Sequence, residues 1–320
     1  MPHLELLSQR TSRSLVRLVS AVAVTCVVSV GSVVALETTT AGNAAATAVP
    51  ADTDGYMPVY AHMPDPTAVE IKKRIDAGWA TGAFLYYKAT DDPFGWTSRW
   101  DDLEETFPNG VDLFVSPKNF TTASLTDWAE RLSPAQRAKT VFAYWQEPEE
   151  NFTTDAERAA FRAKVVQAAD IVQPFGIRNG IELQAWTLNE GNKTEWGGAD
   201  NFKAFFPADT SKLDYVGISL YDYHQNFSGA KQLKPVKVLL NRNLPHAEWG
   251  PLASGWSVPA GTPQGAPIRA ERAAAAADGF AWAKKYGADS YGWFDFPAWD
   301  GTKDYAVDGD PALLAVLTAL

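Results

Sequence analysis

The stretch Thr140-Val-Phe-Ala-Tyr-Trp-Gln-Glu147 is the most informative part of this chain for its fold. Its apolar, β-branched and aromatic residues are typical of a strand buried in a parallel sheet. The run ends on a carboxylate, and the next residue, Pro148, cannot donate a hydrogen bond to continue the sheet. Residues 154–172 then follow a helical pattern, with apolar side chains on one face. One strand followed by one helix is therefore the unit expected to recur.

Short apolar or aromatic runs of this kind recur along the chain. The predicted strands are 58–61, 83–88, 111–117, 140–147, 181–187, 215–221, 246–250 and 290–296. Helical patterns cover 66–77, 124–138, 154–172, 270–286 and 311–320, whereas the segments after the second, fifth and sixth strands are less clearly helical. Eight strands alternating with helices over about 250 residues predict an α/β fold with a single (β/α)8 TIM barrel. The competing doubly wound sheet would need a glycine-rich first turn, which residues 58–64 do not offer.

The N-terminal segment has the pattern of a secretory signal peptide. Arg10, Arg13 and Arg17 precede an apolar run over residues 18–36, and Ala46-Thr47-Ala48 is a suitable cleavage site. We therefore expect a signal peptide at 1–48, a flexible lead-in at 49–55 and the barrel domain at 56–320. An uncleaved membrane anchor is the alternative, because the apolar run is long enough to span a bilayer. Cleavage predicts a secreted, extracellular protein without a membrane partner.

Composition narrows the classes of partner. The formal net charge of −10 argues against binding to nucleic acid or to anionic membranes. Cys26 is the only cysteine and lies in the leader, so disulfides and cysteine-based zinc sites are not expected in the mature chain. The 12 Trp residues favour binding of a polysaccharide or oligosaccharide, although most of them are expected to pack in the core. We expect a monomer that needs no cofactor and no metal.

Barrel active sites lie at the C-terminal ends of the strands, so strand-end carboxylates are the first candidates for chemistry. Glu147 closes the predicted fourth strand, and Glu248, in Leu244-Pro-His-Ala-Glu-Trp-Gly250, closes the predicted seventh. Two such carboxylates would supply the proton donor of a glycosidase and its nucleophile or base. The alternative for each is a structural role: Glu147 paired with Lys88 or Lys118, and Glu248 with His246 or an arginine.

With these two strand ends, the sequence resembles the large clan of retaining glycoside hydrolases with catalytic Glu residues on strands four and seven. Within that clan it is most similar to glycoside hydrolase family 26, the β-mannanase group, in an actinobacterial-looking secreted form. The Trp145-Gln-Glu-Pro-Glu149 segment is similar to the clan's acid/base motif, and Ala247-Glu-Trp-Gly250 to its nucleophile motif. One departure is Gln146, where the clan has Asn and family 26 has His.

The resemblance implies roles for further residues. Tyr221, in Ile218-Ser-Leu-Tyr-Asp222, would hydrogen-bond the nucleophile, and Trp293, in Tyr291-Gly-Trp-Phe-Asp295, would floor the sugar site. Substrate-binding positions at the predicted strand ends are Gln146, Trp186, Tyr221, Trp249, Trp293 and Asp295.

The implied activity is endo-acting hydrolysis of a polysaccharide such as β-mannan, β-glucan or xylan, with retention of configuration. Glu147 would donate the proton, so its pKa should be raised, and Glu248 would attack the anomeric carbon. A catalytically inactive barrel that binds glycans is the alternative, because Gln146 could fail to orient Glu147.

Overall fold

The computed structural model describes residues 57–64, 66–87, 93–95, 97–189, 198–222, 229–256, 258–259, 266–295, 303–304, 307 and 309–320. The predicted leader, the lead-in and the residues between these ranges lie outside the described residues. Within the ranges, no helix is both long enough and apolar enough to cross a bilayer.

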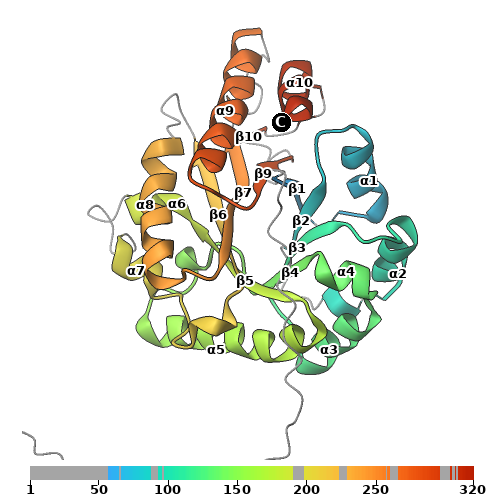
Figure 1. The fold of residues 1–320 in the computed structure, drawn as a ribbon, viewed down its shortest axis with the longest axis vertical. Coiled ribbons are helices and arrows are strands. Elements are labelled where there is room, and N and C mark those ends of the chain that lie inside the picture. The colour runs from blue at the N-terminus through green and yellow to red at the C-terminus, as the bar shows by residue number, and fades with distance from the viewer. Residues whose placement is uncertain are drawn as a thin grey trace, which may run out of the picture. The chain divides into compact units, whose positions relative to one another are not determined.

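Eight parallel strands in the described part of the chain close into a barrel, which Figure 1 shows as a ring of arrows. They are β1 Val59–Pro64, β2 Gly82–Tyr86, β3 Asp112–Ser116, β4 Thr140–Ala143, β5 Arg178–Gln184, β6 Tyr215–Asp222, β7 Glu248–Trp256 and β9 Tyr291–Phe294. Strand β1 pairs with both β2 and β9, and this closes the ring. The predicted (β/α)8 barrel is confirmed, and each predicted strand overlaps an observed one.

Helices surround the ring of strands (Figure 1). They are α1 Ala68–Asp76, α2 Thr97–Thr106, α3 Thr122–Arg131, α4 Pro134–Ala138, α5 Asp155–Val172, α6 Ala185–Asn189, α7 Ala199–Lys203, α8 Gly229–Asn243, α9 Ala266–Lys285 and α10 Pro311–Ala319. Short 3₁₀ turns are η1 Pro93–Gly95, η2 Pro148–Glu150, η3 Gln173–Phe175 and η4 Thr210–Lys212. A small antiparallel sheet joins β8 Val258–Pro259 to β10 Lys303–Asp304.

Two helices differ from the sequence prediction at prolines. The helix predicted over 124–138 is split, because Pro134 starts α4 and Ser133 caps it by accepting from the Gln136 N–H at 3.2 Å. A proline fits at a first helical position, where its missing N–H would be unpaired in any case. Conversely, Pro235 lies inside α8, where an interruption was expected. The packing of α8 on the barrel therefore outweighs the hydrogen bond that Pro235 removes.

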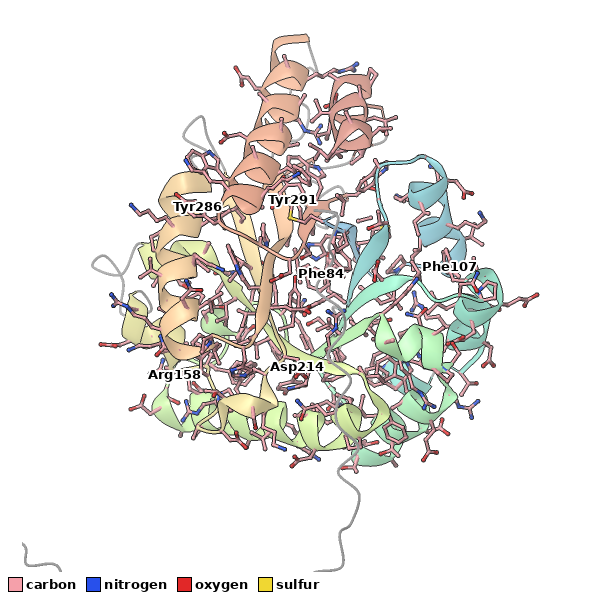
Figure 2. The ribbon with its side chains drawn as sticks, in the orientation of Figure 1. Phe84, Phe107, Arg158, Asp214, Tyr286 and Tyr291 are labelled. Atoms are coloured by element: carbon pink, nitrogen blue, oxygen red, sulfur yellow. The ribbon has the colours of Figure 1, made fainter. Side chains whose placement is uncertain are left out.

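Side chains on the strands alternate between two buried layers, as the two-residue period of a strand requires. The inner layer fills the barrel with Tyr60, Phe84, Tyr86, Phe114, Val141, Ala143, Tyr215, Leu252 and Ala253, and Phe294 packs against it. Their neighbours along the strands, such as Ala61, Leu85 and Phe142, belong to the larger cluster between barrel and helices. In Figure 2, Phe84 lies within the ring of strands and Arg158 of α5 lies outside it.

Candidate active site

The β4 strand ends earlier than predicted, and the residues that follow it form a strained turn. β4 stops at Ala143, and residues 144–147 turn before η2 begins at Pro148. Trp145 (φ 59°) and Glu147 (φ 50°) have left-handed backbone conformations, which non-glycine residues adopt rarely. The Trp145 indole N–H donates to Asn151 Oδ1 at 2.9 Å and steadies this turn. Strain of about 1–3 kcal/mol per residue is typical of functional sites, so the turn marks Glu147 as a functional candidate.

Glu147 is connected to the neighbouring strand through Glu182. The Glu147 N–H donates to the carbonyl oxygen of Glu182 at 3.2 Å and to its carboxylate Oε2 at 3.1 Å. The other carboxylate oxygen of Glu182 accepts from the Ser219 hydroxyl on β6. The ends of β4, β5 and β6 thus bring two acidic side chains together around one serine.

A third acidic residue completes this carboxyl cluster, which we define as Glu147, Glu149 and Glu182. Glu149 is 3% exposed, and its Oε1 accepts from the Gln184 N–H at 2.7 Å and from the Thr187 hydroxyl at 3.3 Å. Its Oε2 is buried without a hydrogen-bond partner. The structure records no ion pair for any of the three carboxyl groups within the described residues.

Burial favours the protonated form throughout the carboxyl cluster. It raises the pKa of Glu147, and the nearby Glu150 raises it further, while hydrogen bonds from Ser219 and Gln184 oppose the rise. Burial also raises the pKa of Glu149 to about 8, and it raises the pKa of Glu182 well above the usual range with a further contribution from Glu147. At neutral pH the cluster therefore retains protons, which a general acid requires.

Several buried polar atoms near the C-terminal ends of the strands lack hydrogen-bond partners in the described structure. They are His62 Nδ1 and Nε2, Ser116 Oγ, Gln146 Oε1, Glu147 Oε1 and Gln184 Oε1. An unpaired buried polar atom costs about 1–3 kcal/mol, so such a group of atoms is expected where a polar ligand binds. His62 stacks on Phe84 with ring centres 4.1 Å apart, and burial lowers its pKa well below the usual range. His62 is therefore neutral and can offer a donor and an acceptor to a hydroxyl-rich ligand.

The prediction that Glu147 and Glu248 share one rim of the barrel is wrong. Glu248 is the first residue of β7 and pairs with Tyr215, the first residue of β6. Its Oε2 accepts from Arg178 Nη1 at 2.5 Å, and Arg178 is the first residue of β5. Because all these strands are parallel, Glu248 lies at the N-terminal end of the barrel, opposite Glu147. The structural alternative, a pairing with an arginine, is the observed one.

The error arose because Gly250 and Pro251 resemble the end of a strand. β7 continues through them to Trp256, and Pro251 lies beside the register shift between β6 and β7, where a proline is tolerated. Gly250 is required by packing, since a Cβ at this position would lie 2.3 Å from Ser290 Oγ.

Trp249 and Trp293, which were predicted to bind the substrate, do not face the barrel interior. Both belong to the buried cluster between barrel and helices, with 2% and 1% exposure. Lys237 of α8 lies 5.4 Å from the centre of the Trp249 ring. On β9, the alternation places Phe294 inside the barrel instead, with its ring centre 4.6 Å from that of His62. Phe294 is thus the interior aromatic residue of this strand.

The remaining predicted positions have different outcomes. Asp295 is buried, and its two oxygens accept from Arg74 Nε of α1 and from the Val307 N–H, each at 2.8 Å. Its role is therefore structural, because it connects α1 to Val307. Gln146 lies beside Glu147 at the C-terminal end of β4, where it was predicted. Trp186 lies in α6 directly after β5, and Tyr221 pairs with Gly255 near the end of β6, but their side chains lie outside the described residues.

The sequence analysis missed Glu182, Glu149 and Ser219. A signal for Glu182 was present, because Ile181-Glu-Leu-Gln184 alternates apolar and polar residues in a strand expected to be buried. Such alternation indicates polar side chains that face the barrel interior. No comparable signal marked Ser219 or Glu149.

Comparisons with known proteins show the fold of this chain. No family model matches it, and no curated protein does. A modular endo-β-1,4-mannanase of glycoside hydrolase family 26 from Cellulomonas fimi is 15% identical, with a TM-score of 0.57 over 83% of this chain and 70% of that one. The virulence factor SghA from Agrobacterium tumefaciens, solved with its substrate analog salicin, is 10% identical, with a TM-score of 0.56 over 83% of this chain and 96% of that one. The similarity to family 26 is supported at the level of the fold.

Proposed function

We propose that this protein is a carbohydrate-active barrel that cleaves glycosidic bonds of a β-linked polysaccharide, with Glu147 as general acid. The observation that carries this proposal is a carboxyl group on a strained turn at the C-terminal end of β4, whose pKa is raised by burial. Active sites of (β/α)8 barrels lie at this end. The fold shared with a β-1,4-mannanase supports the class of substrate.

In the proposed reaction, Glu147 gives its proton to the oxygen of the bond that breaks. A raised pKa keeps that proton in place at neutral pH until the leaving oxygen develops negative charge. The unpaired buried atoms of His62 and Gln146 are suited to hydrogen-bond sugar hydroxyls near this acid. The faces of Tyr86 and Phe294, whose ring centres are 6.2 Å apart, add apolar surface.

Glu248 is not part of this proposal, because it lies at the opposite end of the barrel. Retention through a covalent intermediate on Glu248 was expected from two carboxylates about 5–5.5 Å apart, a separation that positions on opposite ends do not support. Glu147 is therefore assigned as the acid. Identifying the anomer that is released first would show whether the reaction retains or inverts the configuration.

A second candidate function is glycan binding without turnover. It is favoured by β7, whose residues after Glu248 include no carboxylate that could act from this strand. If this candidate is correct, calorimetry should detect binding of a polysaccharide, and the protein should release no reducing sugar from it.

The test is a screen of the purified protein on mannan, xylan, mixed-linkage glucan and chitosan, followed by kinetics of E147Q. Removing a general acid should lower kcat/KM on the polysaccharide by about 10²–10⁴-fold. On an aryl glycoside with an activated leaving group the loss should be much smaller, since that group needs little protonation. Equal losses on both substrates would contradict the role of Glu147 as acid.

Export is part of the same proposal and has its own test. The basic and apolar N-terminal residues predict that the mature chain begins after Ala48 and acts outside the cell. We propose in addition that it is a monomer. N-terminal sequencing of the protein recovered from the culture medium and its mass in solution would test both statements.

A further inference from the structure

We propose that Glu182 is a positioning residue that holds Glu147 in its active geometry and shares a proton with it. The role in catalysis rests on the proposed function, whereas the sharing of a proton does not. The proposal concerns a residue that is buried completely, with 0% exposure, and that therefore cannot reach a substrate itself.

The geometry connects the two carboxyl groups in a specific way. Glu182 Oε2 accepts the Glu147 N–H at 3.1 Å, which helps to hold the left-handed backbone of Glu147. Glu182 Oε1 accepts from the Ser219 hydroxyl, and hydrogen bonds from Ser219 and Gln184 also reach Glu147. Both oxygens of Glu182 are therefore engaged on the side that faces Glu147 and β6.

The charges around Glu147 come from four elements of the barrel mouth. The titratable groups that interact with it are Tyr86 of β2, Lys118 after β3, Glu149 and Glu150 of η2, and Glu182 of β5. Lys118 is the cation among these described groups, and it lies 5.2 Å from the centre of the Trp145 ring. One cation cannot neutralise the carboxyl cluster, so two adjacent buried carboxyl groups are expected to titrate as a unit that holds on to one proton.

This arrangement predicts opposite effects for two substitutions. When the pair loses its last proton, the other carboxyl group is already ionised. E182Q removes that like charge while keeping the shape of the side chain, so the higher titration midpoint of the pair should move about 1 pH unit lower. Its amide can still accept the Glu147 N–H and can donate to Ser219, whose hydroxyl also accepts. S219A removes a hydrogen bond to the ionised carboxylates, so the same midpoint should move to higher pH. A residue that merely fills space would not produce shifts of opposite sign.

The experiment is a titration of the full chain with ¹³C-labelled glutamate carboxyl groups, followed by NMR, with E147Q used to assign the Glu147 signal. E130Q, on the exposed face of α3, is the control and should leave the midpoint of Glu147 unchanged. An unchanged midpoint in E182Q, or a shift in the same direction in both variants, would overturn the proposal. If E182Q does not fold, the upward shift in S219A remains required.

A wild-type protein that hydrolyses no glycan would defeat the proposed function, and the titration would still decide the pairing of Glu147 with Glu182. If a glycan is hydrolysed, the alkaline limb of the pH profile of kcat/KM should move with the NMR midpoint, downward in E182Q and upward in S219A.

Discussion

The acidic groups at the two ends of this barrel have different partners. At the N-terminal end, Glu248 pairs with Arg178, and Asp214 accepts from the Asn179 N–H at 2.8 Å and from Gln173 Nε2 at 2.9 Å. At the C-terminal end, Glu147, Glu149 and Glu182 lie together, and burial raises the pKa of each.

The acidic groups at the N-terminal end are suited to stabilising the fold, and those at the C-terminal end are suited to transferring a proton. A carboxylate in an ion pair stabilises the fold and has no proton to give, whereas a buried carboxyl group without a cation is an acid available for transfer. In (β/α)8 barrels the C-terminal face carries the active site and the N-terminal face carries stability, which agrees with the separation seen here.

The largest effect on stability is expected at the N-terminal end, from Gly250→Ala. A Cβ on Gly250 would lie 2.3 Å from Ser290 Oγ and 2.5 Å from the Ser290 carbonyl oxygen, and the backbone there cannot move away cheaply. We expect a loss of about 3 kcal/mol in the free energy of unfolding, measured by denaturant titration. Wild-type stability in Gly250→Ala would contradict this packing.

At the C-terminal end, E149Q should change how stability depends on pH. The pKa of Glu149 is raised to about 8 in the folded protein from 4.5, so its stabilising contribution is complete below about pH 4.5 and is lost as pH rises to 8. E149Q should therefore be more stable than the wild type at pH 8. The expected difference is about 1.4 kcal/mol for each pH unit by which the pKa of Glu149 in the folded protein exceeds 4.5. Thermal unfolding at pH 5 and pH 8 measures the difference. Parallel pH dependence in both proteins would refute a protonated Glu149.

A smaller effect is expected from Tyr215→Phe at the N-terminal end. Tyr215 is 2% exposed, and its hydroxyl hydrogen-bonds to Ser290 Oγ. Removing the hydroxyl should lower the free energy of unfolding by about 1 kcal/mol and leave the titration of Glu147 unchanged. Urea unfolding and the same NMR titration test both parts. A change in the Glu147 midpoint would show that the two ends are coupled.

The fold could be predicted from the sequence because strand and helix patterns repeat regularly. Glu147 could also be found, since Pro148 marks the end of its segment clearly. Glu248 could not be placed, because Gly250 and Pro251 imitate a strand end and only the pairing with β6 shows that β7 continues. The layer of Trp293 depends on the register in which β9 pairs with β1, and a slip of one residue in that register reverses which side chains face the barrel interior. Glu182 and Ser219 come together only through the register of β5 and β6.

The comparison of E147Q with E248Q on one glycan substrate tests the central claim most directly. We expect E147Q to lose about 10²-fold or more in kcat/KM, because it removes the acid at the C-terminal end. E248Q should retain wild-type kcat/KM and lose only stability, because it breaks the ion pair with Arg178 at the other end. An E248Q protein that is folded and inactive, together with an active E147Q, would contradict the account.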